Sequence, residues 1–177
     1  MMTILGRYSP EQEIYSIDEC FLDFDGVLNG RETREPSSPI HPGIFLHGRL
    51  VARLSILCER TGARVVLSTS WRHRLHDDGR AVTLEDLQAA LWAVGFTGEV
   101  VGTTPDLRPL GALPKSAYTP RADEIRAWVA EHKPAAFVVF DDYADADVDG
   151  RLVQTDVRIG LTDADVERAV QILGGAS

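Results

Sequence analysis

The apolar residues of this chain follow two kinds of pattern that take turns along the sequence. Short apolar runs of the kind that form buried strands occupy five segments, at 17–24, 64–68, 98–103, 135–140 and 151–154. Segments with apolar residues three or four positions apart, typical of helices, lie between and after them, at 44–61, 83–95, 119–132 and 162–174. Strands that alternate with helices predict a parallel sheet covered by helices on both faces. We therefore expect a three-layer, Rossmann-like α/β fold.

Residues that begin or end helices support these boundaries. Gly62 follows the first helical segment as a C-terminal stop, and Thr83 with Asp86 forms a capping-box pattern before the second. The polar loops at 29–41 and 105–118 leave little room for an inserted domain. We expect one domain over residues 1–177, with residues 1–18 as an N-terminal extension.

Composition narrows the classes of partner. The formal net charge of −9 argues against an extended nucleic-acid-binding surface, which needs clustered basic residues. Neither a membrane-length apolar run nor a signal-peptide pattern is present, so we expect no membrane association and a cytoplasmic location. Cys20 and Cys58 fall in apolar segments without metal-site spacing, which predicts reduced core residues. The sequence leaves the oligomeric state open.

Two carboxylates stand where the first apolar run ends. Asp23 and Asp25 are one residue apart and Gly26 follows them. Alternate residues of a strand point to the same side, so the two carboxylates would repel each other unless a cation or a shared proton intervenes. A hard divalent cation such as Mg²⁺ fits an oxygen-rich strand end. The alternative is an ordinary Asp-Gly turn with solvated carboxylates.

Polar residues also follow two later strand segments. Hydroxyls occupy positions 68–70, and Asp141 and Asp142 follow the run at 135–140. The carboxyl ends of strands in an open parallel sheet carry the ligand site, so these groups are expected to meet there.

Three segments, FLDFDGVLN, VVLSTSW and VVFDD, resemble in order and position the motifs of the haloacid dehalogenase (HAD) superfamily of phosphatases. The resemblance extends from about Cys20 to the last helix and is closest to the small HAD domains of RNA-repair proteins. It implies that Asp23 is the nucleophile, which forms an aspartyl-phosphate, and that Asp25 is the general acid and base. It implies that Thr69 binds a phosphoryl oxygen; a shift of one residue would give this role to Ser68 or Ser70.

The resemblance also implies a cofactor and a cation. Mg²⁺ would be held by Asp23, the backbone carbonyl of Asp25, and Asp142 with Asp141 beside it. The family usually has a lysine near the helix before the fourth strand, to offset the charge of the phosphate. Here the candidates are Arg121 and Lys115, and we favour Arg121 because the first turn of a helix aims a side chain better than a loop does.

The absence of room for a cap domain predicts an open site, suited to a phosphorylated small molecule or a nucleic-acid end. Ser70, Arg72 and Lys115 are candidate substrate-binding residues. Arg72 belongs to a basic cluster at 72–76, which either steers phosphate into the site or is simply solvated. Trp71 is expected in the core, with stacking on a base as the alternative.

The sequence thus predicts an Mg²⁺-dependent phosphomonoester hydrolase. A phosphotransferase and a catalytically silent binding module of the same fold are the alternatives. A signalling receiver domain is disfavoured because its acceptor aspartate would fall at 68–70, where this chain has hydroxyls. A P-loop motif is absent, which excludes kinases of that type.

Overall fold

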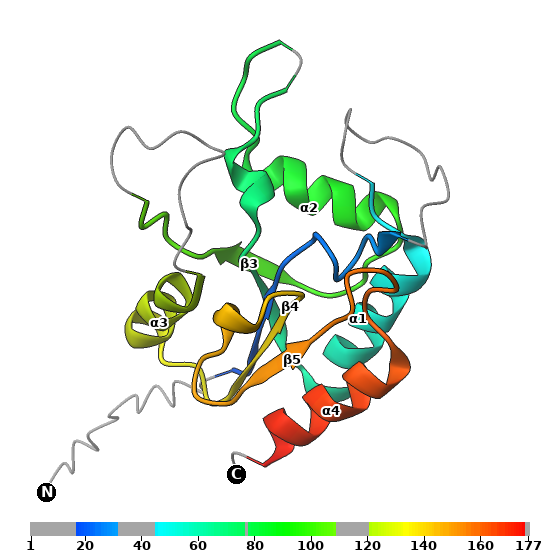
Figure 1. Ribbon diagram of the computed structural model, residues 1–177, viewed down its shortest axis with the longest axis vertical. Coiled ribbons are helices and arrows are strands. Elements are labelled where there is room, and N and C mark those ends of the chain that lie inside the picture. The colour runs from blue at the N-terminus through cyan, green and yellow to red at the C-terminus, as the bar shows by residue number, and fades with distance from the viewer. Residues whose placement is uncertain (1–16, 32–44, 77, 109–120, 176–177) are drawn as a thin grey trace, which may run out of the picture.

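A parallel sheet forms the centre of the computed structural model, which describes residues 17–31, 45–76, 78–108 and 121–175. The sheet has the strand order β3-β2-β1-β4-β5, so the first strand lies in the middle (Figure 1). The strands of the described residues are β1 (Glu19–Leu22), β2 (Arg64–Leu67), β3 (Val100–Thr103), β4 (Phe137–Asp141) and β5 (Leu152–Gln154). All neighbouring pairs are parallel. The chain runs outward from β1 in one direction and returns to the other side of it at β4.

Helices cover both faces of this sheet, which confirms the expected α/β fold class. They are α1 (Gly48–Thr61), α2 (Leu84–Ala93), α3 (Arg121–His132) and α4 (Asp163–Gly174). On β1, Cys20 and Leu22 point into the larger apolar cluster, to which α1, α2 and α4 contribute. Phe21 points the other way and packs with Ile125 of α3. Figure 1 shows α1 and α4 side by side and α3 on the opposite side of the sheet.

Capping side chains set the helix starts much as the sequence indicated. In α2, Thr83 Oγ1 accepts a hydrogen bond from the backbone N–H of Asp86, and the carboxylate of Asp86 accepts one from the N–H of Thr83. The first helix begins at Gly48 rather than at residue 44, because the ring of His47 caps its first turn. It ends at Gly62, whose φ of +73° suits glycine. Residues 119–120, the expected start of α3, lie outside the described residues.

Both cysteines are buried and free, as expected of core residues. Burial raises the pKa of the Cys58 thiol to about 12, so this group stays protonated. Within the described ranges, none of the helices has the length and apolar character needed to cross a membrane. Most of the expected N-terminal extension and of the loops at 29–41 and 105–118 lies outside the described residues.

Candidate active site

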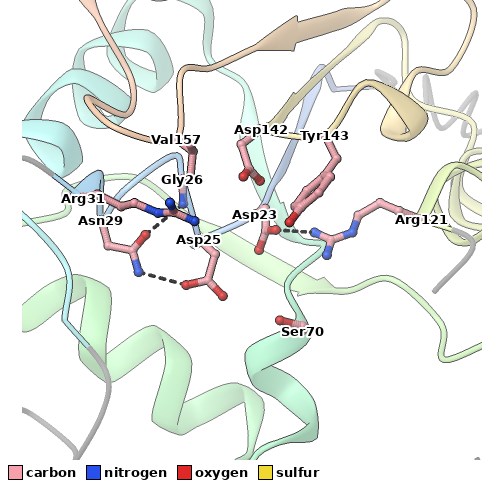
Figure 2. Close-up of a pocket in the computed structure, with 10 residues that line it drawn as sticks. All are labelled: Asp23, Asp25, Gly26, Asn29, Arg31, Ser70, Arg121, Asp142, Tyr143 and Val157. Carbon is pink, nitrogen blue, oxygen red and sulfur yellow. Dashed lines mark hydrogen bonds and ion pairs between the residues drawn. The ribbon is translucent and has the colours of Figure 1, made fainter. Parts of the chain in front are cut away.

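The carboxyl ends of β1, β2 and β4 open into a pocket of about 340 Å³. Figure 2 shows the residues that line it, most of them polar. They are Asp23, Asp25, Gly26, Asn29, Arg31, Ser70, Arg121, Asp142, Tyr143 and Val157. The pocket therefore lies at the edge of the sheet that the strand-end residues predicted.

Asp23 follows β1 directly and lies at the floor of this pocket, with only 2% of the residue exposed. Its backbone N–H donates to the carbonyl of Phe140, which ties it to β4. One carboxylate oxygen accepts the N–H of Phe24 at 2.7 Å, and the other lies 2.8 Å from Nη1 of Arg121. Burial raises the pKa of Asp23, and the adjacent guanidinium of Arg121 opposes that rise.

Arg121 is the first residue of α3, and its guanidinium reaches across to the ends of the strands. Besides Asp23, its Nη1 lies 3.1 Å from Oδ2 of Asp141 and donates to the carbonyl of Ser68. Burial acts to lower the pKa of Arg121, but the two carboxylates raise it overall, so the side chain stays charged. The structure thus brings the favoured cation to the favoured nucleophile. The other candidate, Lys115, lies outside the described residues.

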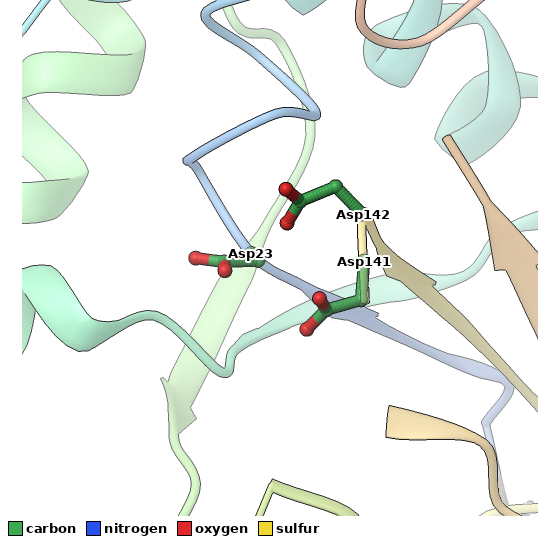
Figure 3. A group of neighbouring side chains, drawn as sticks. All are labelled: Asp23, Asp141 and Asp142. Carbon is green, nitrogen blue, oxygen red and sulfur yellow. The ribbon is translucent and has the colours of Figure 1, made fainter. Parts of the chain in front are cut away.

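Three carboxylates gather at the ends of β1 and β4 (Figure 3). Asp23, Asp141 and Asp142 each offer an oxygen, and these oxygens all lie within 4.8 Å of one another. Burial raises the pKa of Asp141 to about 7 and also raises that of Asp142. Oδ1 of Asp142 is buried without a hydrogen-bond partner in the described part of the chain. An all-oxygen set with one unpartnered oxygen fits a hard divalent cation such as Mg²⁺.

Asp25 is more exposed than Asp23, and both of its carboxylate oxygens accept hydrogen bonds. Oδ1 takes the side-chain amide of Asn29 at 2.9 Å, and Oδ2 takes the indole N–H of Trp71 at 2.8 Å. Figure 2 shows the carboxylate of Asp25 turned towards Asn29 and that of Asp23 turned towards Arg121. Trp71 is buried, as the core assignment predicted, and so does not offer a face for stacking on a base. Nothing in the sequence indicates its contact with Asp25.

The three hydroxyls after β2 occupy different environments. Thr69 is fully buried; its hydroxyl hydrogen-bonds to Asp23 and also accepts the backbone N–H of Trp71. Ser70 is exposed and lines the pocket. Ser68 is buried, and its hydroxyl has no partner among the described residues. Thr69 therefore lies against Asp23 and is not among the residues that line the pocket, whereas Ser70 is one of them.

Arg72, a candidate substrate-binding residue, is not among the residues that line the pocket. Its guanidinium lies 2.5 Å from Oε2 of Glu124, and it also donates to the carbonyl of Thr104 at 3.1 Å. The carboxylate of Glu124 is fully buried and needs a cation beside it. Arg72, which the sequence suggested as a residue that steers phosphate, thus forms an ion pair with the buried Glu124 of α3.

Sequence comparison identifies the family. Residues 20–166 match the family described as "HAD domain in Swiss Army Knife RNA repair proteins". The chain belongs to this family. Membership supports a phosphatase or hydrolase function of the HAD kind, and HAD domains typically use Mg²⁺, with which the three buried aspartates are compatible.

A second similarity covers less of this HAD domain. The chain is 32% identical over 85 residues to a DNA polymerase IV from Clostridium acetobutylicum. The matched segment covers 44% of this chain and 22% of that relative. The HAD domain thus spans only about a fifth of the relative it matches. No solved structure matches the chain.

The HAD domain holds four side chains at its site whose roles there the motifs did not indicate. Asn29 and Trp71 both bind Asp25, and Tyr143 and Arg31 stand at the pocket wall. The only available signal was position: Asn29 ends the first motif and Trp71 ends the second. Spacing alone could not show that the two converge on one carboxylate.

Proposed function

We propose that this HAD domain hydrolyses phosphomonoesters through an aspartyl-phosphate on Asp23, with Mg²⁺ as cofactor. The observation that carries the proposal is the position of Asp23 at the pocket floor, 2.8 Å from the guanidinium of Arg121 and beside the unpartnered oxygen of Asp142. A nucleophilic carboxylate needs nearby positive charge because the phosphoryl group it attacks is itself an anion. Arg121 supplies one such charge.

The first step transfers the phosphoryl group to the protein. An oxygen of Asp23 forms a bond to phosphorus as the bond from phosphorus to the leaving oxygen breaks. Asp25 gives its proton to that leaving oxygen, so the product departs as a neutral alcohol. Arg121 and the hydroxyl of Ser70 would stabilise the charge on the phosphoryl oxygens, and the buried hydroxyl of Thr69 would hold Asp23 in place.

The second step returns Asp23 to its starting state. Asp25, now a carboxylate, takes a proton from a water molecule that attacks phosphorus, and the bond from phosphorus to Asp23 breaks. Mg²⁺, held by Asp23, Asp142, Asp141 and the carbonyl of Asp25, would neutralise the negative charge that builds up on the phosphoryl group. Inorganic phosphate is the product.

The substrate we propose is a phosphorylated nucleic-acid end or nucleotide. The lining of the pocket is polar, so a polar substrate fits better than an apolar one. The description of the family refers to RNA repair, which agrees with this choice. The acidic protein has no need of a long basic surface if it binds only the phosphorylated terminus.

A panel of phosphomonoesters tests the proposal. The purified protein should release phosphate with Mg²⁺ and lose that activity in EDTA, and the panel should contain 5′- and 3′-phosphorylated RNA and DNA oligonucleotides, nucleotides, sugar phosphates and para-nitrophenyl phosphate. Asp23→Asn should lose nearly all activity, whereas Asp145→Asn, at an exposed position of the short 3-10 helix Ala144–Ala146, should keep it. Full activity in Asp23→Asn would refute the mechanism, and an inactive wild type would favour a silent binding module.

A further inference from the structure

We propose that Trp71 is a positioning residue which, together with Asn29, aims the carboxylate of Asp25 at the leaving oxygen of the substrate. The inference rests on the proposed function, because it assigns a role within the same reaction. Neither residue donates a proton to the substrate in this scheme. They act only through Asp25.

The two contacts hold the carboxylate from both of its oxygens. The indole N–H of Trp71 lies 2.8 Å from Oδ2, and the amide of Asn29 lies 2.9 Å from Oδ1. Indole nitrogen can only donate, so this contact exists only with an accepting oxygen. A carboxylate held by one donor can still rotate about its own axis, whereas one held at both oxygens has a fixed plane. The side chain of Asp25 is 44% exposed, and Arg74 adds a long ion pair, with Nη2 3.9 Å from Oδ2. Without the two short hydrogen bonds, this long contact would hold the plane of the carboxylate less tightly.

Trp71 is itself held firmly enough to position another group. Its ring is 1% exposed and meets Phe24 edge-on, with centroids 5.2 Å apart and planes at 86°. The guanidinium of Arg74 lies over the ring, 4.6 Å from its centroid. The hydroxyl of Thr69 accepts its backbone N–H at 3.3 Å. A functional group is aimed well when the residue behind it is locked by packing and hydrogen bonds of this kind.

Asn29 is fixed in the complementary way. Its side-chain oxygen accepts the N–H of Gly26 at 2.9 Å, so its amide nitrogen must face Asp25. Gly26 has a φ of +68°, and its carbonyl accepts the hydroxyl of Thr155 at 2.9 Å. The turn after β1 therefore carries both Asp25 and one of the two donors that hold it.

The consequence is a dependence on the leaving group. An alkoxide is a poor leaving group and needs the proton of Asp25, whereas the anion of an acidic nitrophenol leaves without it. Loss of aim at Asp25 should therefore impair alkyl phosphates more than activated aryl phosphates. The effect belongs in kcat/KM, which covers the steps up to formation of the aspartyl-phosphate; the later attack by water is common to all substrates and affects only kcat.

The test compares Trp71→Phe with the wild type on two substrates, an alkyl phosphate and 2,4-dinitrophenyl phosphate. Phenylalanine keeps an apolar ring but lacks the N–H. Because general acid catalysis contributes about 10²–10⁴-fold, we expect kcat/KM for the alkyl ester to fall by at least about 10-fold and that for the dinitrophenyl ester by less than about 2-fold. Trp92→Phe, on the exposed side of α2, is the matched control and should leave both values unchanged.

A second variant guards against a folding defect in Trp71→Phe. Asn29→Asp keeps an acceptor for the N–H of Gly26 but removes the donor to Asp25. Like Trp71→Phe, it should lower kcat/KM for the alkyl phosphate more than kcat/KM for 2,4-dinitrophenyl phosphate. Equal losses on both substrates, or no loss in either variant, would overturn the positioning role while leaving the phosphatase in place. A wild type that hydrolyses neither substrate would overturn the proposed function itself.

Discussion

Replacing Arg72 by methionine should destabilise the protein rather than weaken its substrate binding. The substitution keeps most of the apolar stem but removes the charge that faces Glu124, whose carboxylate is fully buried. Among the described residues, that carboxylate also accepts the N–H of Leu107, at 3.3 Å. A buried carboxylate with so little compensation is unfavourable in the folded state.

The size of the effect follows from the burial of both partners. Side-chain exposure is 9% for Arg72 and 0% for Glu124, so the pair is buried rather than superficial. Removing one member of such a pair costs about 3–5 kcal/mol. For a domain of this size each kcal/mol corresponds to about 2–4 °C, so the melting temperature should fall by roughly 6–20 °C. In Arg72→Met/Glu124→Met most of this loss should return, since no buried charge is left unpaired.

Urea unfolding followed by circular dichroism measures these differences. The control is Arg126→Met, which removes an exposed ion pair with Asp123 on the same helix and should change stability by no more than about 1 kcal/mol. A loss of stability in Arg72→Met no larger than that in Arg126→Met, or a double variant no more stable than Arg72→Met, would contradict this role of Arg72. A steering role for Arg72 would instead appear as a several-fold rise in KM with unchanged stability.

Three further outcomes follow from the site. Gly26→Ala should abolish the rise in melting temperature that Mg²⁺ causes, because the new Cβ would lie 2.6 Å from Cβ of Asp142. The control is Gly79→Ala, also at positive φ but with open space around its Cβ, and it should keep that rise. A rise retained in Gly26→Ala would contradict the metal site. Arg121→Met should lower kcat by about 10²–10³-fold, which is the range for loss of one group that stabilises charge in the transition state. If the variant stays active, Lys115 rather than Arg121 offsets the charge of the phosphate. Burial and the adjacent guanidinium groups of Arg72 and Arg108 lower the pKa of His73 from 6.5 to about 4, so the folded state resists its protonation. The contribution of His73 to folding stability is therefore complete above about pH 6.5 and is lost as the pH falls towards 4. In His73→Gln, the urea midpoints of unfolding at pH 7 and pH 4.5 should differ less than in the wild type. An equal difference would show that other groups cause the loss of stability in acid.

Much of the fold could be predicted because its signals are local. Apolar runs found all five described strands within a few residues, and the pair Thr83 and Asp86 fixed the start of α2. The start of α1 was placed too early because the cap of His47 has no distinctive sequence signal. The meeting of Asp23 with Asp141 and Asp142 followed from the rule that strand ends share one edge of a parallel sheet.

The remaining contacts could not be predicted because they depend on the packing of segments far apart in the chain. Arg72 and Glu124 are separated by 52 positions, and near Arg72 the sequence shows only a basic cluster. Trp71 and Asp25 are separated by 46 positions, and nothing in an apolar aromatic residue indicates which way its N–H will point. Periodicity identifies the buried face of an element but not the partner of a polar atom on that face.

The central position of β1 gives Asp23 a different neighbour on each side. Hydroxyl groups follow β2 on one flank, and carboxylates follow β4 on the other. A nucleophile on an edge strand would have only one neighbouring strand, whose end would have to bind both the phosphoryl group and the cation. In the reaction we propose, the phosphoryl oxygens would approach Asp23 from the flank of β2 and the cation from the flank of β4. Substitutions after β2 should then change substrate affinity and those after β4 should change metal affinity, so that the topology would make the two affinities separable by mutation.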